Sequence, residues 1–406
     1  MAIIIQKFGG TSVGSLERIE AVAEQIIKTR NQGHQVVAVL SAMSGETNRL
    51  SALALKLDDK PSPRELDMLL ASGEQVSISL LAIALIKRGY SAVSLLAHQI
   101  GLKTNNSFNK ARILDIDNTR MLTELQQGHV VIVAGFQGVD NEGNITTLGR
   151  GGSDTSAVAI ATSLRAKECQ IFTDVDGVYT TDPRIDESAK KLDYISFDEM
   201  LEMASSGAKV LHNRSVEYAG KHKMPLRVLS SFKPGDGTNI HFGEDTRVNH
   251  PVSAITANKD EALLSLIGLP DNGEVTARVF ADLAEADIEV DMIVQSASLD
   301  NKINLNFTVH QNDLTQSNLI LELIQQECDL QTLASDSTLV KVSLVGNGMR
   351  SHAGVVATVL KCLHNSAVDV FLISTAEIKI SVLVKQQSLQ LAVRVLHKAF
   401  QLNDKK

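Results

Sequence analysis

The sequence has little of what would place it in a special class of protein. Its three cysteines, Cys169, Cys328 and Cys362, are odd in number and lack metal-ligand spacing, which is typical of reduced cytosolic thiols. Residues 1–15 are too short and polar for a signal peptide, and we expect no apolar run of membrane-spanning length. Acidic residues (47) outnumber basic ones (39), which argues against nucleic acid or an anionic membrane as a partner. We therefore expect a cytoplasmic protein.

The first strand exit also lacks both common phosphate-binding fingerprints. Residues 3–15 read IIIQKFGGTSVGS, an apolar strand that ends on a lysine and two glycines. Lys7 precedes the glycines, whereas a Walker A loop places its lysine after them, and the glycines do not space as G-x-G-x-x-G. A cation beside a Gly-Gly turn therefore needs another explanation.

The 406 residues, 44% of them hydrophobic and 21% charged, predict a globular protein of two or three domains. Up to about residue 235 the pattern alternates between strands and helices, which predicts an α/β fold with a mostly parallel sheet and helices on both faces. Ligands of such sheets bind at the carboxyl ends of the strands. The predicted elements are strands over 2–8, 35–40, 91–96, 129–134 and 170–173, a helix that Ser15 caps, and a long helix over 63–87.

The second part of the chain contains an internal repeat. Residues 263–296 and 339–375 each read as a strand with a Ser-Leu-apolar-Gly run, a turn, an amphipathic helix and a second apolar strand. An alternating strand, over 302–309 or 377–384, and a final helix close each copy. The repeat predicts two α+β units of βαββαβ type packed side by side.

Three stretches of the first part carry candidate chemistry. TLGRGGSDTSAVAIA (147–161) runs from a glycine-rich turn into a helix, whose first amides and Arg150 favour an anion. FTDVDGVYTTDPR (172–184) follows a strand and is rich in Asp, so it suits either a solvated turn or a nucleotide with magnesium. Glu74 lies in a largely apolar helix and needs a partner, for which a ligand amine is one possibility. His98, His212 and His222 show no ligand or triad spacing and are interpreted as structural.

Taken together, these motifs resemble the aspartate kinases of the amino-acid kinase superfamily. The resemblance rests on KFGGTSVGS, LSAMSGETNRL, SGEQVS, GFQGVDNEGNITTLGRGGSDTSA, FTDVDGVYTTDPRI and GAKVLHNRSVE, in order and over nearly the whole chain. The tail resembles paired ACT regulatory domains, including VDMIVQ and ISTAEIKIS. The resemblance as a whole implies a three-layer αβα catalytic domain over 1–235, a linker with a possible strand over 236–262, and ACT domains over 263–335 and 339–406.

The resemblance implies ATP-dependent phosphorylation of the L-aspartate β-carboxylate, the first step towards lysine, threonine, methionine and diaminopimelate. A carboxylate with a pKa of ~3.9 needs no strong base, so catalysis depends on positioning and on cations that offset phosphate repulsion. Lys7 would supply that charge, oriented by Asp154. The implied substrate ligands are Ser41, Thr47, Glu74, Arg150, Gly151 and Asp154. The implied ATP ligands are Lys7, Phe8, Gly9, Gly10, Thr173, Asp174, Tyr179, Asp182, Arg184, Lys209 and Val210. Magnesium would travel on phosphate oxygens and water, with no side-chain cage.

The implied effectors are lysine, threonine or both, bound between ACT domains of a homo-oligomer. The expected effector residues are Gln295, Gly354, Ser374 and Thr375. The chain departs from the family at Gly273-Glu274, where a Pro-Gly is usual, so Glu274 either disables the first effector site or attracts a cationic side chain. Three alternatives remain open at the level of sequence: another amino-acid kinase, such as a glutamate or acetylglutamate kinase; an amino-acid sensor without catalysis; and a structural partner subunit.

Overall fold

The structure is a computed structural model, and the chain divides into two compact units. The first unit comprises Met1–Val178, Lys191–Ser205 and Lys209–Thr246, and the second Tyr179–Lys190, Ser206–Ala208 and Arg247–Lys406. The structure describes residues 1–208, 210–243, 251–271, 273–297, 302–328, 330–349 and 354–404.

An eight-stranded sheet forms the centre of the first unit, in the order β12-β14-β13-β9-β1-β2-β6-β3. All neighbouring pairs are parallel except β13 and β14, which confirms the predicted mostly parallel sheet. Its strands are β1 (Ile3–Phe8), β2 (Gln35–Leu40), β3 (Ala92–Leu95), β6 (Val130–Ala134), β9 (Glu168–Thr173), β12 (Tyr194–Ser196), β13 (Leu226–Ser230) and β14 (Thr238–His241).

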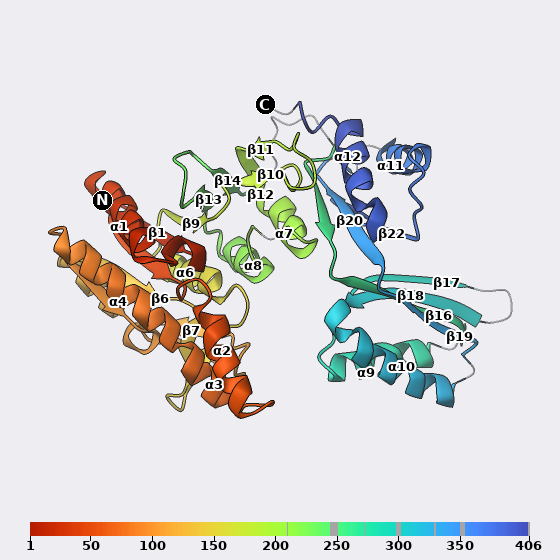
Figure 1. The fold of residues 1–406 in the computed structure, drawn as a ribbon, viewed down its shortest axis with the longest axis horizontal. Helices are drawn as coiled ribbons and strands as arrows, with labels where there is room; N and C mark the ends of the chain where they lie inside the picture. Colours follow the sequence, from red (N-terminus) through yellow and green to blue (C-terminus); the bar gives the residue numbers. More distant parts are fainter. Residues whose placement is uncertain are drawn as a thin grey trace. The chain divides into compact units, whose positions relative to one another are not determined.

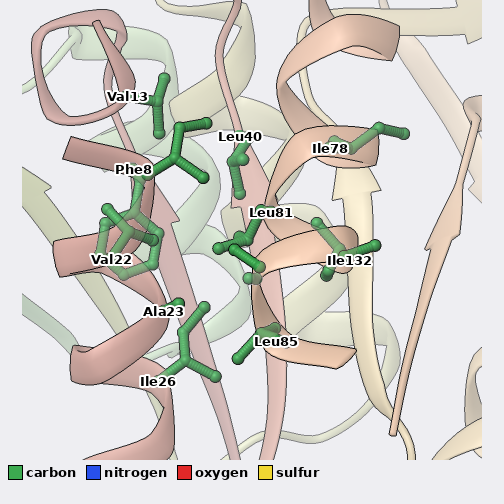
Figure 2. Packing of buried hydrophobic residues seen from close by; sticks show 14 of the residues in the cluster. Phe8, Val13, Val22, Ala23, Ile26, Leu40, Ile78, Leu81, Leu85 and Ile132 are labelled. Atoms are coloured by element: carbon green, nitrogen blue, oxygen red, sulfur yellow. The ribbon is translucent and has the colours of Figure 1, made fainter. Parts of the chain in front are cut away.

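Helices cover both faces of this sheet and give three layers. Helices α1 and α4 pack on one face against Phe8, Leu40 and Ile132, as Figure 2 shows from close by, while α6 and α8 lie on the other face. A smaller sheet, β5-β4-β7-β8, lies beside them. The helices are α1 (Leu16–Asn31), α2 (Glu46–Leu57), α3 (Pro63–Leu70), α4 (Ser72–Lys87), α5 (Thr119–Gln126), α6 (Gly152–Ser163), α7 (Phe197–Ser205) and α8 (Asn213–His222). The remaining strands are β4 (Leu102–Thr104), β5 (Ile113–Ile116), β7 (Gln137–Val139), β8 (Ile145–Thr147), β10 (Val178–Tyr179) and β11 (Lys191–Leu192).

Two expectations about the stretch 63–87 are corrected. The predicted single helix is divided at Ala71 into α3 and α4. By length and composition Pro63–Lys87 is also apolar enough to cross a membrane, contrary to the expectation that no run reaches that length. Half of the most apolar part of this stretch is buried inside the protein, through residues such as Ile78, Leu81 and Leu85. A helix packed into a protein core passes the same test.

The second unit contains two four-stranded sheets, each with a helix pair against it (Figure 1). The sheet of the first repeat has the order β17-β18-β16-β19, and that of the second repeat the order β15-β20-β22-β21. The first contains β16 (Glu261–Pro270), α9 (Glu274–Glu285), β17 (Val290–Ala297), β18 (Lys302–His310), α10 (Leu314–Glu327) and β19 (Thr332–Asp336). The second contains β15 (Ala254–Asn258), β20 (Leu339–Val345), α11 (Gly354–Asn365), β21 (Leu372–Thr375), β22 (Lys379–Lys385) and α12 (Leu389–Ala399).

The second repeat obtains its fourth strand from upstream in the chain. Strand β15 pairs antiparallel with β20, with Ala254 opposite Val345, so the whole first repeat is inserted between two neighbouring strands of the second. Strand β14, in turn, belongs to the main sheet of the first unit although it lies beyond residue 235. The domain boundaries expected from the sequence stay a prediction, and these two strands are the observations that bear on them.

Candidate active site

Parallel strands end together at one edge of the main sheet. Phe8, the last residue of β1, stands opposite Leu40 of β2 and Phe172 of β9. The residues that follow bond across the strand ends: Ser41 N donates to Phe8 O at 3.0 Å and Gly9 N to Phe172 O at 3.4 Å. This edge therefore gathers the motifs expected to bind ligands.

Strand alternation directs Lys7 away from the α1–α4 core and towards α6. Phe8 lies in that core, stacked on Phe172 with ring centroids 4.8 Å apart, so its neighbour Lys7 projects from the opposite face. There Lys7 Nζ lies 2.5 Å from Oδ1 of Asp154, in the first turn of α6. The side chains are 11% and 13% exposed, so the ion pair is largely shielded and yet open to the strand edge.

Glycines leave room beside this ion pair. A Cβ at Gly9 would lie 3.5 Å from Lys7 Nζ, and a Cβ at Gly10 would lie 3.0 Å from Ala42 O. A side chain at Gly10 would therefore crowd the neighbouring strand end, and one at Gly9 would fill space next to the ammonium. An anionic group can approach Lys7 here because both positions lack a side chain.

Glu74 of α4 is a buried carboxylate with only part of its hydrogen bonding satisfied. Its Oε1 accepts a bond from Ala42 N at 2.9 Å, and Oε2 is buried with no partner among the described residues. Burial raises the pKa of Glu74 to about 7, although the hydrogen bond from Ala42 opposes the shift. Gly73 lies against Ala42, where a Cβ would be 2.8 Å from the Ala42 side chain. A donor from a ligand, such as an ammonium, would satisfy Oε2.

The loop between β8 and α6 carries Arg150 and is held from two directions. On one side, the buried Asp67 of α3 accepts from Thr147 Oγ1 at 2.6 Å and Thr147 N at 2.8 Å. On the other, Arg214 of α8 donates to Leu148 O at 2.6 Å. Arg150 itself is exposed. The backbone under Arg150 is thus fixed while its guanidinium stays available to a ligand.

His212, interpreted from the sequence as structural, also lies at this site. It caps α8, accepting from Arg214 N at 3.4 Å, and its ring lies over Gly151, where a Cβ would come within 2.2 Å of the ring. Gly151 has φ +66°, so both its conformation and this close ring require glycine. Burial lowers the pKa of His212, and the charge of Asp154 opposes that shift.

Sequence reasoning missed Asp67, Arg214 and His212 as supports of the Arg150 loop. The available signals were an acidic residue, Asp67, next to apolar residues in the helix over 63–70, and the run His-Asn-Arg at 212–214 after a turn. The partners of Asp67 and Arg214 in this loop lie 80 and 66 residues away in sequence, so spacing alone does not reveal them.

The remaining substrate and nucleotide candidates of the first unit lie at the strand ends or on nearby helices. Thr173 closes β9, and its Oγ1 donates to Asp174 Oδ1 at 3.1 Å. Thr47 is the second residue of α2 and is half-buried, as is Val210. Lys209 lies outside the described residues.

Three other nucleotide candidates belong to the second unit. Tyr179, Asp182 and Arg184 are part of Tyr179–Lys190. Arg184 and Asp182 form a two-pronged ion pair, with Nη2 to Oδ2 at 2.8 Å and Nε to Oδ1 at 3.0 Å. The hydrogen bond from Arg184 lowers the pKa of Asp182 despite partial burial. The predicted site residues are therefore divided between the two units.

The effector candidates lie on strand edges and a helix start of the second unit. Ser374 and Thr375 end β21, an edge strand paired with β22, and Gln295 is exposed on the edge strand β17. Gly354 begins α11, and a Cβ there would meet nothing within 4 Å. Edge strands leave backbone groups available for a ligand or another chain.

Comparison with known proteins agrees with this arrangement. A profile of the Amino acid kinase family matches residues 2–230, and a profile of the ACT domain matches residues 264–322 and 342–400. The aspartate kinase of Pseudomonas putida KT2440 is 53% identical over 404 residues, which are 99% of this chain and 98% of the relative. The chain belongs to the aspartate kinase family. Aspartokinase 2 of Bacillus subtilis is a more distant member, 45% identical over 99% of this chain and 98% of its own.

A solved structure of the family has the same fold. Escherichia coli aspartokinase III in complex with aspartate and ADP superposes with a TM-score of 0.84 at 28% identity, over 98% of this chain and 99% of the other. The same enzyme in complex with lysine and aspartate gives a TM-score of 0.77 over the same shares. The two sheets of the second unit are therefore ACT repeats of an aspartate kinase.

Proposed function

We propose that the chain transfers the γ-phosphoryl group of ATP to the β-carboxylate of L-aspartate, giving 4-phospho-L-aspartate and ADP. The carboxylate oxygen forms a bond to the γ-phosphorus, and the bond from that phosphorus to the β–γ bridging oxygen breaks. The observation that carries the proposal is the Lys7–Asp154 ion pair at the strand edge that also gathers Gly9, Gly10 and the half-satisfied Glu74. A cation for phosphate and an anion for an ammonium meet at one edge.

Lys7 is the proposed catalytic cation. The substrate carboxylate is ionised at neutral pH, so the barrier comes from bringing it towards anionic phosphates. Lys7 Nζ would offset charge on the moving phosphoryl group, and Asp154, 2.5 Å away, would hold the ammonium in place. Gly9 and Gly10 would let the phosphates approach, next to Phe8.

Glu74 and Arg150 are the proposed ligands of the amino acid's two other charges. The unpaired Oε2 of Glu74 would accept from the α-ammonium, and the exposed Arg150 would bind the α-carboxylate in a forked pair. Ser41 and Thr47 would line the same site with Gly151. Such a pair of opposite charges selects an amino acid over a simple dicarboxylate.

Nucleotide binding is proposed for the ATP candidates described above. Thr173, Asp174 and Val210 belong to the first unit and Tyr179, Asp182 and Arg184 to the second, with Lys209 the further candidate outside the described residues. The Asp174 carboxylate and Thr173 hydroxyl are oxygen donors of the kind that magnesium and its water shell accept. Mg²⁺ would arrive with ATP and neutralise phosphate charge.

Regulation and assembly are proposed for the ACT repeats. Lysine or threonine, as end products of the route that this phosphorylation begins towards lysine, threonine, methionine and diaminopimelate, would bind at Gln295, Gly354, Ser374 and Thr375. The support is the exposure of Gln295 and Thr375 on edge strands and the lysine complex of Escherichia coli aspartokinase III. The same edges suit a homo-oligomer formed through the ACT repeats. We also propose a cytoplasmic location, for which the free cysteines are the support.

An acyl-phosphate assay tests the reaction. The full chain with MgATP is incubated with aspartate, glutamate or N-acetylglutamate, and the product is trapped with hydroxylamine as a hydroxamate. We expect a hydroxamate and equimolar ADP from aspartate at a kcat/KM at least a hundredfold above the other two. Equal or greater turnover of glutamate would contradict the proposed substrate, and no turnover of any would contradict the proposed reaction.

A further inference from the structure

The segment 179–190 belongs structurally to the ACT repeats, although it interrupts the first unit in sequence. It follows β9 after a short connection and carries Asp182 and Arg184, yet it forms one compact unit with residues 247–406. Its contacts within that unit identify what holds it there. Helix α12 and strand β15 supply hydrogen bonds to it.

His397 of α12 is the first anchor. Its side chain is fully buried, with Nε2 2.9 Å from Thr180 Oγ1 and Nδ1 3.3 Å from a carboxylate oxygen of Asp186. Thr180 Oγ1 already accepts a bond from Lys190 N at 2.9 Å. These contacts fit the His397 tautomer that carries its proton on Nδ1. Nδ1 then donates towards Asp186, and Nε2 accepts from the Thr180 hydroxyl.

Arg394, one turn earlier on α12, is the second anchor. Its Nε donates to Ile185 O at 2.9 Å, and the Ile185 side chain is buried in the core of the second repeat with Leu389 and Val393. Strand β15 adds a backbone bond, from Ile255 N to Thr180 O at 2.7 Å. The segment is therefore fixed at residue 180 and again at residues 185 and 186.

Asp182 and Arg184, two of the proposed nucleotide ligands, lie between the anchored residues 180 and 185. The Arg184 side chain is 86% exposed and that of Asp182 33% exposed, and the two pair with each other. A turn held at both ends presents a guanidinium outward in a defined place. His397 is fully buried, and the Arg394 Nε is already bonded to Ile185 O, so we expect both to act through position.

The first repeat shows that the ACT fold does not require these anchors. Helices α10 and α12 each follow a short 3-10 turn, Gln311–Asp313 or Gln386–Ser388. When their starts are aligned, Leu319 takes the place of Arg394 and Glu322 that of His397. Leu319 is 59% exposed. The polar anchors are thus an addition to the repeated helix and not part of its packing.

We propose that Arg394 and His397 are positioning residues, through which α12 of the second ACT repeat places Asp182 and Arg184 and so sets the affinity for ATP. The proposal rests on the proposed nucleotide role of Asp182 and Arg184. Helix α12 packs in the same core as α11, which begins at the expected effector residue Gly354, and as β22, which pairs with the expected effector residue Thr375 of β21. An effector that displaces α12 would therefore change ATP affinity before any other kinetic constant.

The test uses the full chain with Arg394→Met, which removes an exposed donor, and Thr180→Val, which removes the hydroxyl that meets His397. Each is expected to raise the KM for ATP, and the Kd of a non-hydrolysable ATP analogue, about fivefold, as loss of one hydrogen bond implies. The KM for aspartate and kcat should stay within twofold. Arg394→Lys keeps a donor and should restore at least half of the lost affinity.

Lys398→Met is the matched control, since Lys398 is exposed one turn further along α12, and its ATP affinity should be unchanged. Arg184→Ala tests the underlying role separately. If Arg184→Ala weakens ATP binding and Arg394→Met and Thr180→Val do not, the positioning proposal is wrong while the nucleotide role stands. If Arg184→Ala leaves ATP binding intact, the nucleotide role fails and the positioning proposal fails with it. Equal losses in aspartate and ATP affinity would indicate general disruption and would also overturn it.

Discussion

Each unit holds a lysine against carboxylates, and the two lysines are placed very differently. Lys7 is the penultimate residue of β1, with Asp154 on the first turn of a helix and glycines beside it. Lys341 lies in the middle of β20, a strand whose seven residues are all buried. Its Nζ lies 2.7 Å from Glu261 Oε1 and also contacts Asp291, both from the first repeat's sheet.

The difference indicates what each charge is for. Lys7 faces an edge where strands end and a ligand has room, so its charge is available to a reaction. The Lys341 side chain is 2% exposed and bridges two sheets, so its charge is already paired with protein carboxylates. A buried lysine is thus a catalytic candidate by where it lies on its strand, and not by burial or pairing alone.

The largest expected effect is on turnover, from Lys7→Met. Loss of one transition-state cation should lower kcat by about 10²–10³-fold. The melting temperature should fall less than in Lys341→Met, since Lys7 lies at a strand end and does not hold the core together. Steady-state kinetics with circular dichroism melting measures both. Near-normal turnover would remove Lys7 from the mechanism and end the contrast with Lys341.

The reverse pattern is expected of Lys341→Met. Methionine fills a similar volume but leaves the buried Glu261 without its cation, at a cost of about 2–3 kcal/mol in unfolding free energy; this lies below the usual range because Asp291 is 42% exposed. Urea unfolding followed by circular dichroism measures it. Turnover per folded molecule without effector should remain within twofold. A variant that lost turnover and kept its stability would show that the two lysines cannot be told apart by position.

The sequence could predict Lys7 and not Lys341 for a physical reason. Lys7 is marked by local features, an apolar strand followed by Gly-Gly, and local patterns also predicted five of the eight strands of the main sheet and helices such as α1. The partners of Lys341 lie 50 and 80 residues away on another sheet, and the upstream origin of β15 is likewise a matter of tertiary pairing. Glu74 was found because a charge on an apolar helix needs a partner. The supports Asp67 and Arg214 were not found, because their partners in the Arg150 loop lie 80 and 66 residues away in sequence.

Glu74 sharpens the comparison, since it is a buried carboxylate that pairs with no lysine among the described residues. Glu74→Gln keeps the shape and removes the charge that a substrate ammonium would meet. A charge-assisted hydrogen bond contributes about 1.5–3 kcal/mol, so the KM for aspartate should rise about tenfold or more at pH 8. The KM for ATP should change less than twofold. A loss of ATP affinity with aspartate affinity intact would mean that the substrate and nucleotide sides have been exchanged.

The pH dependence of the same residue gives a second measurement. With a pKa of about 7, Glu74 is mostly neutral at pH 6 and mostly ionised at pH 8, so kcat/KM for aspartate should rise about tenfold over that range. Glu74→Gln should flatten this rise and match the natural chain at pH 6.

The raised pKa of Glu74 also determines how the stability of the fold changes with pH. The neutral carboxyl's contribution is fully present below the ordinary value of 4.5 and is lost as the pH rises through about 7. The Gln variant should accordingly be the more stable protein at pH 8, and an unchanged pH profile in the variant would assign the titration to another group.

The smallest expected effect concerns the edge strand β21, on the same sheet as Lys341. Ser374→Ala and Thr375→Val each remove a hydroxyl from that edge without touching the Lys341 contacts. If lysine or threonine binds there, the half-inhibitory concentration should rise about fivefold, the value of one hydrogen bond, while the rate without effector stays within 20% or so. Initial rates against each amino acid, alone and together, measure the first effect, and calorimetry measures binding directly. Ser366→Ala, in the turn after α11, is the matched control and should leave inhibition unchanged.

Lys341→Met adds the decisive comparison. Because Lys341 joins the two ACT sheets, its loss should weaken inhibition while binding of the effector to β21 persists, since the bound site would then be disconnected from the other sheet. If neither amino acid binds at millimolar concentration, the ACT repeats serve assembly alone and the regulatory role of this edge is wrong.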